Sequence, residues 1–391
     1  MLKNYRQLAA ERNENGIPPL PLDAEQTNEL TFLLETHPIE ENKDFLIDLL
    51  KNRILPGVDP SSYIKATWLN SIAKQTKISP LITPIEATQL LGTMMGGYNV
   101  GALIELLQIN DESIAKCAAE SLSNILLVYD ASNEIMELSK TNLFAKQVID
   151  SWLNAEWFLQ KPRLPKELKA TIFKVDGEIN TDDLSPATHA TTRPDIPLHA
   201  MAMLETRVPE ALREINTLKR SGYPIAFVGD VVGTGSSRKS AINSLLWHIG
   251  KDIPFIPNKR SGGIIIGGKI APIFFNTAED SGTLPIECDV NKLKTGDLIS
   301  IYPYEGKITR TSNNNKIGEE LLANFQLKPA TIFDEIQAGG RIPLMIGRAL
   351  TDKIRTQLDL PPSKIFIRSG KESEKVVGFT QAQKIVGKAC G

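Results

Sequence analysis

The 391-residue sequence has few cysteines and histidines, no long apolar run and a net charge of only −2. Its cysteines, Cys117, Cys288 and Cys390, stand singly, which argues against a disulfide framework and a cysteine-held metal site. The four histidines are far apart and lack ligand spacing, so we expect no metal there. Without an apolar run of about 18 residues or a signal-type N-terminus, we expect a cytoplasmic protein that meets no membrane. The small charge favours no large polyanion as an obligate partner.

Residues 1–160 carry the apolar pattern of α-helices throughout. Apolar residues recur at spacings of three and four in FLIDLLKNRI, from Phe45, and in GALIELLQI, from Gly101. The two stretches resemble each other, and each is followed by an acidic loop and a second helical pattern. Helix pairs of this size predict a short HEAT-like stack, in which neighbouring pairs bury each other's apolar faces. An ordinary helical bundle is the alternative.

A linker and a second domain follow the helical part. The stretch 161–169, KPRLPKELK, has two prolines and four basic residues, which is typical of a linker. Over 170–391, short β-rich runs such as PIAFVGDVV and GGIIIGG alternate with helical patterns at 236–249 and around 271–281. The sequence therefore predicts a multi-domain protein, with an all-α HEAT-like domain followed by a mixed α/β domain.

The stretch GDVVGTGSSRKS (229–240) nearly matches a phosphate-binding P-loop, counted from Gly233. Arg238 stands where the P-loop has its second glycine. A strand candidate enters this turn and a helix candidate leaves it, with Ser236 or Ser237 as N-cap, so the helix N-terminus faces an anion. Because the Arg238 guanidinium is a fork of donors that suits a carboxylate, we interpret the turn as an oxyanion site with an arginine clamp. A capped helix with a surface arginine is the alternative.

Two further polar stretches belong to the same predicted domain. GEINTDDLSPATHATTRPD (177–195) looks like a loop and contains Asp182 and the isolated Arg193. The stretch 258–286 has a glycine-rich strand, a helix and a new strand. Three such stretches in one α/β domain predict a shared cleft for a small polycarboxylate.

These residues together carry a family resemblance. The segments 181–186 (TDDLSP), 233–238 (GTGSSR) and 276–285, with Arg193 between the first two, resemble the swivel domain of the aconitase superfamily. The phrases SRKS, RPDIPLHA, NKRSGG and GGKIAPIFFNT resemble the aconitase B family, and the resemblance covers essentially the whole chain. Members of that family begin with a HEAT-like domain followed directly by the swivel domain. The resemblance therefore implies a swivel domain over 170–391.

The resemblance implies a lyase of the tricarboxylic acid cycle that interconverts citrate and isocitrate through cis-aconitate, and that also acts on 2-methylisocitrate. It implies that Ser236 abstracts the proton α to a carboxylate, and that Arg193, Ser236, Ser237 and Arg238 bind the substrate. Asp182 matches an acidic active-site position. Physical chemistry agrees, because arginines and a helix N-terminus stabilise an aci-carboxylate and lower the cost of a serine alkoxide.

The family also has a [4Fe–4S] cluster, held by three cysteines in domains that follow the swivel domain. Cys117, Cys288 and Cys390 stand in other contexts, so we expect no cluster and no metal on this chain. We accordingly expect an N-terminal portion of an aconitase B that is inactive alone and has the remaining aconitase domains as its partner.

Two other functions stay open from the sequence. One is the small subunit of a split hydro-lyase, like that of isopropylmalate isomerase, although the helical N-terminal domain argues against it. The other is an interaction module, which would self-associate or dock partners through 1–160. RNA binding has weak support, because the helical part has no basic stripe and no interleaved aromatics.

Overall fold

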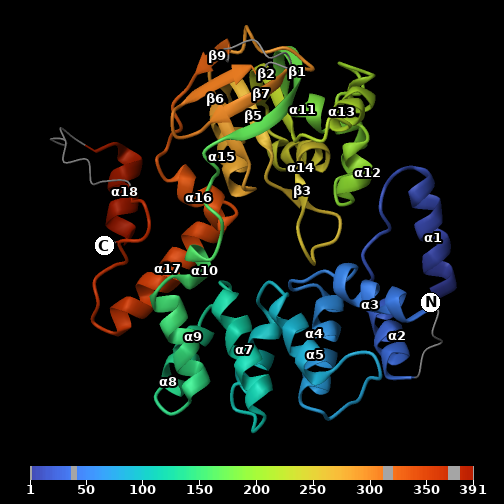
Figure 1. Ribbon diagram of the computed structural model, residues 1–391, viewed down its shortest axis with the longest axis vertical. Helices are drawn as coiled ribbons and strands as arrows, with labels where there is room; N and C mark the ends of the chain where they lie inside the picture. Colours follow the sequence, from blue (N-terminus) through green and yellow to red (C-terminus); the bar gives the residue numbers. More distant parts are fainter. Residues whose placement is uncertain (1, 37–41, 311–319, 369–378, 391) are drawn as a thin grey trace.

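The computed structural model describes residues 2–36, 42–310, 320–368 and 379–390. Within these ranges a helical N-terminal region is followed by a mixed α/β sheet domain, so the predicted multi-domain fold class is confirmed (Figure 1). The helices of the N-terminal region are α1 (Leu2–Glu14), α2 (Ala24–Glu35), α3 (Lys43–Asn52), α4 (Pro60–Ala73), α5 (Pro84–Gly92), α6 (Tyr98–Leu106), α7 (Glu112–Asn124), α8 (Ala131–Leu138), α9 (Leu143–Leu153) and α10 (Glu156–Leu159).

Local sequence signals begin several of these helices. Before α2, the Asp23 side chain accepts from the Gln26 amide while the Gln26 side chain accepts from the Asp23 amide, which is a capping box. Thr83 and Glu86 begin α5 in the same way. Contacts run in chain order, with α2 on α4, α4 on α5, α5 on α7 and α7 on α9, and the apolar faces share one core. This order fits a HEAT-like stack, which stays an interpretation.

A seven-stranded sheet forms the second region, in the order β6-β5-β2-β1-β7-β8-β9. The first four strands in this order are parallel and the last three pair antiparallel. Their bounds are β1 (Leu168–Asn180), β2 (Ile225–Thr234), β5 (Ile264–Ile270), β6 (Leu284–Glu287), β7 (Leu298–Tyr302), β8 (Lys307–Arg310) and β9 (Glu320–Asn324). The short strands β3 (Lys251–Asp252) and β4 (Arg260–Ser261) pair separately.

Both faces of the parallel strands are buried. Phe173 and Phe227 belong to a core that they share with α13, α14 and α15. Their chain neighbours Ile172 and Ala226 belong to the opposite core, which includes β7 and α16. Continuous apolar strands of this kind are typical of parallel sheets covered on two sides. The helices are α11 (Thr181–Leu184), η2 (Ala187–Thr192), α12 (Ile196–Ala200), α13 (Ala211–Lys219), α14 (Arg238–Ile249), α15 (Pro272–Asp280), α16 (Ile332–Ala338), α17 (Arg341–Gln357) and α18 (Gln381–Cys390).

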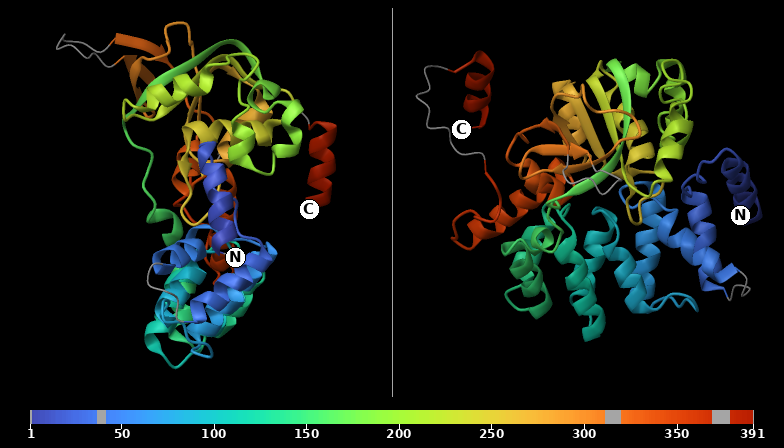
Figure 2. Two further views of the ribbon diagram at one scale, coloured as in Figure 1. Left: turned by 90° about the vertical axis from the view of Figure 1, so that its right-hand side faces the viewer. Right: turned by 45° about the horizontal axis from the view of Figure 1, so that its top comes forward.

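Helix α17 returns from the sheet domain to the helical region (Figures 1 and 2). It packs against α9, and its Leu350 and Ile354 belong to the core of the helical region. Gly347 of α17 lies directly against the Trp157 ring, where a Cβ would stand 2.3 Å from Cζ2. A stretch within the predicted second domain therefore completes the core of the first.

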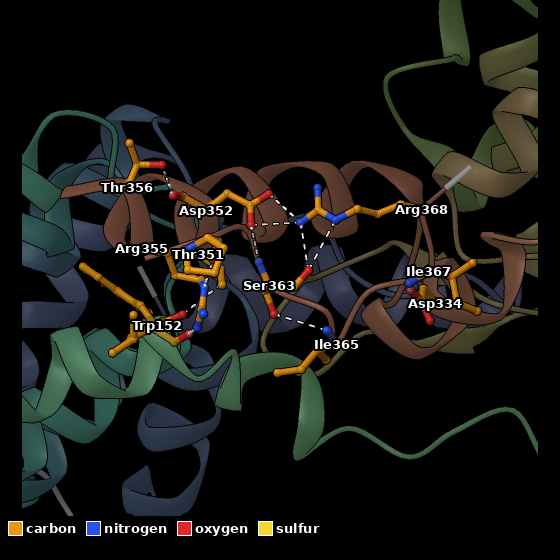
Figure 3. A network of polar contacts seen from close by, with 12 residues as sticks. Trp152, Asp334, Thr351, Asp352, Arg355, Thr356, Ser363, Ile365, Ile367 and Arg368 are labelled. Atoms are coloured by element: carbon orange, nitrogen blue, oxygen red, sulfur yellow. Dashed lines mark hydrogen bonds and ion pairs between the residues drawn. The ribbon is translucent and has the colours of Figure 1, made fainter. Parts of the chain in front are cut away.

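Hydrogen bonds and an ion pair hold the segment after α17 against this helix (Figure 3). The Arg368 guanidinium donates to the Asp352 carboxylate at 2.7 Å, and the Ser363 amide donates to the same carboxylate at 3.1 Å. The Ile367 amide donates to Asp334 of α16 at 2.6 Å. The predicted bounds 1–160, 161–169 and 170–391 stay predictions, although β1 already begins at Leu168. None of the described helices is long and apolar enough to cross a membrane.

Candidate functional site

Two neighbouring parallel strands bring the predicted site residues to one edge of the sheet. β1 ends at Asn180 and β2 ends at Thr234, and these two residues are paired across the strands. α11 begins directly after β1, and α14 begins after the turn that follows β2. Since ligands of α/β sheets bind outside the carboxyl ends of parallel strands, this edge is the expected place for a site. The stretch 177–195, interpreted as a loop, instead contains the end of β1 and two short helices, α11 and η2.

Glycine is needed in the turn because the two chain segments come very close. Gly235 has φ +104°, and a Cβ there would lie 2.5 Å from Thr181 Oγ1. In the space that glycine leaves, the Ser237 amide donates to Thr181 Oγ1 at 3.2 Å. The start of α14 is therefore held against the start of α11, and the N-termini of both helices face the same edge.

Arg193 and Ser237 are brought together across the site. The Arg193 Nη2 donates to Ser237 Oγ at 3.1 Å. Ser237 is the N-cap residue of α14, one of the two expected, but its side chain makes no cap hydrogen bond. Its hydroxyl meets the arginine instead. The buried Nε of Arg193 has no hydrogen-bond partner among the described protein groups, so this guanidinium keeps an unused donor beside the helix N-terminus.

Ser236 and Arg238 flank Ser237 at the open surface. Ser236 is exposed and Arg238 is half-buried. The Arg238 Nη1 lies 3.5 Å from the Ser236 carbonyl oxygen, so the guanidinium turns back over the turn. The predicted roles of Ser236 and Arg238 in substrate binding stay predictions.

The two aspartates of α11 have different surroundings. Asp183 completes a capping box with Asn180 and lies 3.3 Å from Arg207 Nη1, so it serves the local fold. Asp182 is exposed at the first turn of α11, at the same sheet edge as the serines. Its predicted role in substrate binding stays a prediction.

Sequence reasoning missed a buried polar group behind the turn. His199 is 2% exposed, and its ring bonds Ser185 through Nε2 at 2.7 Å and Thr192 through Nδ1 at 2.9 Å. Burial and the nearby Arg193 lower the pKa of His199 below its usual value. Ser185 in turn donates to Ser240 of α14 at 2.8 Å. No local pattern in the sequence marks this histidine, which follows Arg193 by six residues.

The described cysteines do not fit an iron–sulfur cluster. Cys117 lies in α7 of the helical region, and Cys288 follows β6 in the sheet domain. Burial raises the pKa of the Cys117 thiol, and raises that of Cys288 to about 12, so neither favours the thiolate that ligates iron. In the described part of the chain, no three His, Cys, Asp or Glu side chains are grouped to hold a metal ion. No chemical step is therefore assigned to a cluster on these residues.

Comparison with known families agrees with this architecture. The family described as "Aconitate B N-terminal domain" matches residues 4–158, which is the helical region. The family described as "Aconitate hydratase 2 N-terminus" matches residues 170–379. The chain is thus homologous to a class of hydro-lyases. It belongs to the aconitase B family, as its sequence motifs predicted.

Individual relatives cover the whole chain. It is 62% identical over 391 residues to aconitate hydratase B of Synechocystis sp. (strain ATCC 27184 / PCC 6803 / Kazusa), covering 100% of this chain and 44% of that protein. It is 52% identical over 402 residues to aconitate hydratase B of Escherichia coli (strain K12), covering 100% of this chain and 46% of that protein. The chain therefore spans less than half the length of these two relatives.

A more distant relative matches only part of the chain. The 3-isopropylmalate dehydratase small subunit of Hydrogenobaculum sp. (strain Y04AAS1) is 26% identical over 163 residues, covering 40% of this chain and 88% of that protein. Its match covers 40% of this chain, whereas the aconitase B relatives cover all of it. The aconitase B match thus accounts for more of the chain than a small-subunit likeness does.

Proposed function

We propose that this chain supplies the carboxylate-binding and proton-abstracting turn of an aconitate hydratase, which interconverts citrate and isocitrate through cis-aconitate and also acts on 2-methyl-cis-aconitate. The observation that carries the proposal is the meeting of Arg193 with Ser237 at the N-terminus of α14. Two arginines and a helix N-terminus at one sheet edge form a site for a multiply charged small anion. Citrate, cis-aconitate and isocitrate are small anions with three carboxylates, so their negative charge complements this site.

Ser236 is the base in this proposal. Ser236 is exposed in the turn two residues before α14 begins, and the Arg238 guanidinium lies 3.5 Å from its backbone carbonyl oxygen. These positive groups lower the energy of a serine alkoxide, and they also stabilise the aci-carboxylate that forms when the proton α to a carboxylate leaves. Arg193 and Ser237 hold a substrate carboxylate, so that the reacting carbon stands before Ser236.

Binding by the chain itself is the direct test. We expect citrate to bind the purified chain in isothermal titration calorimetry. Arg193→Gln should weaken binding about tenfold, because a charge-assisted hydrogen bond to carboxylate is lost. Lys239→Ala serves as a control, since Lys239 is exposed beside the turn and has no proposed role. Equal binding by the arginine variant and the control would refute the proposed carboxylate site.

Turnover separates the base from the binding groups. In an aconitate hydratase that carries this chain, Ser236→Ala should lower the rate of cis-aconitate hydration by about 10²–10⁴-fold, the usual contribution of a general base. Citrate affinity should fall much less than the rate, because Ser236 contributes only one neutral hydroxyl to binding. The chain alone should hydrate no cis-aconitate, and turnover together with iron–sulfur absorbance in the purified chain would contradict this expectation.

The partners follow from the same proposal. The remaining aconitase domains would cover the site edge and supply the cluster, and the helical region would offer a surface for self-association. Sedimentation of the chain over a range of concentrations, with and without iron, tests self-association; a monomer throughout would count against it. RNA binding keeps only the weak support described above.

A further inference from the structure

A closed ring of contacts links the two residues of the candidate anion site through the protein interior. Arg193 contacts the Ser237 hydroxyl directly at 3.1 Å. Behind this contact, Ser240 Oγ donates to the Ser237 carbonyl oxygen at 3.0 Å, and Ser185 Oγ donates to Ser240 Oγ at 2.8 Å. The ring then returns through His199 and Thr192, the residue before Arg193.

Within this ring of contacts, His199 joins the segments around α11, η2 and α12. Its Nε2 meets Ser185, which directly follows α11, and its Nδ1 meets Thr192 at the end of η2. His199 itself lies in α12, and Ser240 and Ser237 belong to the start of α14. Because His199 is only 2% exposed, each unmade bond would leave a buried polar atom unpaired.

The direction of the bond from Ser185 to Ser240 favours one tautomer of the His199 imidazole. Ser240 donates its proton to the Ser237 carbonyl, and Ser185 donates its proton to Ser240. Ser185 therefore needs a donor at its own oxygen, and only a protonated Nε2 provides it. In this tautomer Nδ1 is an acceptor, so the single hydroxyl proton of Thr192 turns to Nδ1 from the His189 carbonyl, which lies 2.8 Å from the Thr192 oxygen. The opposite tautomer would take the Ser185 proton and break the chain of bonds to α14.

We propose that His199 is a positioning residue for Arg193 and Ser237, the two residues that bind the anion. In this role it acts as the Nε2-protonated imidazole that donates to Ser185. This inference rests on the proposed function for the claim that Arg193 and Ser237 bind a carboxylate, whereas their geometry comes from the structure. His199 does not touch the substrate. It fixes the α14 N-terminus relative to Arg193, so that the guanidinium and the Ser237 hydroxyl meet a carboxylate at the correct spacing.

Four variants of the full chain test the proposal. In His199→Gln the amide nitrogen stands near the Nε2 position and still donates to Ser185. In His199→Asn the amide reaches only toward Thr192, and His199→Leu makes neither bond. His248→Leu is the matched control, because His248 is also buried, its ring bonds the Ala200 carbonyl at 2.8 Å, and it is not a member of the ring of contacts.

We expect His199→Gln and His248→Leu to bind citrate within about threefold of the unaltered chain, and His199→Asn and His199→Leu to bind about tenfold more weakly, the effect of one hydrogen bond. The ¹⁵N spectrum of the imidazole should report protonated Nε2 and bare Nδ1. A protonated Nδ1 would overturn the proposal. So would equal binding by the Gln and Asn variants, or a loss in His248→Leu as large as that in His199→Leu.

The two proposals can fail separately. If the unaltered chain binds no citrate, the proposed function fails, and the positioning role is read instead from the NMR resonances of the Ser237 amide and the Arg193 Nε–H. These resonances should shift in His199→Asn and His199→Leu and return in His199→Gln. Unchanged resonances in all the variants would overturn the positioning role alone.

Discussion

We expect a buried pair of glutamates to make the protein less stable as pH rises. Glu279, at the end of α15, and Glu335, in α16, are each 3% exposed. Oε1 of Glu279 and Oε2 of Glu335 have no hydrogen-bond partner among the described protein groups. Burial, and then the charge of Glu335, raise the pKa of Glu279 to about 7. We therefore expect a proton to be shared between the two carboxyl groups, which would give both oxygens a partner.

Other charged groups next to Glu279 and Glu335 only partly compensate the negative charge of the two carboxylates. Arg341, at the start of α17, lies 3.5 Å from Glu279 Oε2 and bonds Asp280 at 2.8 Å. Thr331 donates to Glu335 Oε1 at 2.8 Å. Burial also raises the pKa of Glu335. With one arginine shared among three acids, full ionisation leaves uncompensated negative charge in the interior.

The direction and the size of the change in stability with pH follow from the pKa of Glu279. Because folding raises it from 4.5 to about 7, the folded state holds the proton more tightly than the unfolded state. The stabilisation is complete below about pH 4.5 and is lost as pH rises through about 7, and it amounts to about 3 kcal/mol. Glu279→Gln keeps an amide donor for Glu335 and cannot ionise. The variant should therefore match the unaltered protein near pH 4.5 and exceed it by up to about 3 kcal/mol near pH 8.

Urea unfolding at several pH values measures this difference. The unaltered protein and the variant share every other titrating group, so the change in their difference with pH isolates the pair. Glu214→Gln, on the exposed surface of α13, is the control and should alter stability by less than about 0.5 kcal/mol at any pH. If Glu279→Gln loses stability with pH as steeply as the unaltered protein, the shared proton is refuted.

Further predictions concern close packing and the site turn. Gly347→Ala places a Cβ 2.3 Å from the Trp157 ring and should destabilise the protein by about 1–3 kcal/mol in thermal unfolding. Gly101→Ala, in the open on α6, should instead stabilise it by roughly 0.5–1 kcal/mol; equal effects of the two changes would contradict the packing argument. Thr181→Val removes the acceptor of the Ser237 amide, so it should cost about 1–3 kcal/mol and weaken citrate binding. Citrate affinity equal to that of the unaltered chain would mean that this bond does not position the turn.

Local sequence patterns determined much of the fold. Apolar residues at helical spacing predicted the first region, and the helical patterns at 236–249 and 271–281 became α14 and α15 within two residues. Periodicity succeeds here because each element buries one continuous apolar face. The turn at 233–238 could also be predicted from the sequence, because Gly233 and Gly235 are needed where the backbone adopts positive φ.

Tertiary structure alone decided the rest. No local pattern indicates that α17 completes the core of the helical region, that Gly347 faces Trp157, or that Glu279 and Glu335 share a buried junction. His199 gave no signal either, since its partners Ser185 and Ser240 come from separate elements. The physical reason is common to all of these. Periodicity and turn chemistry report which face of an element is buried, whereas a pKa, a tautomer or a close contact depends on the particular groups that distant segments bring to that face.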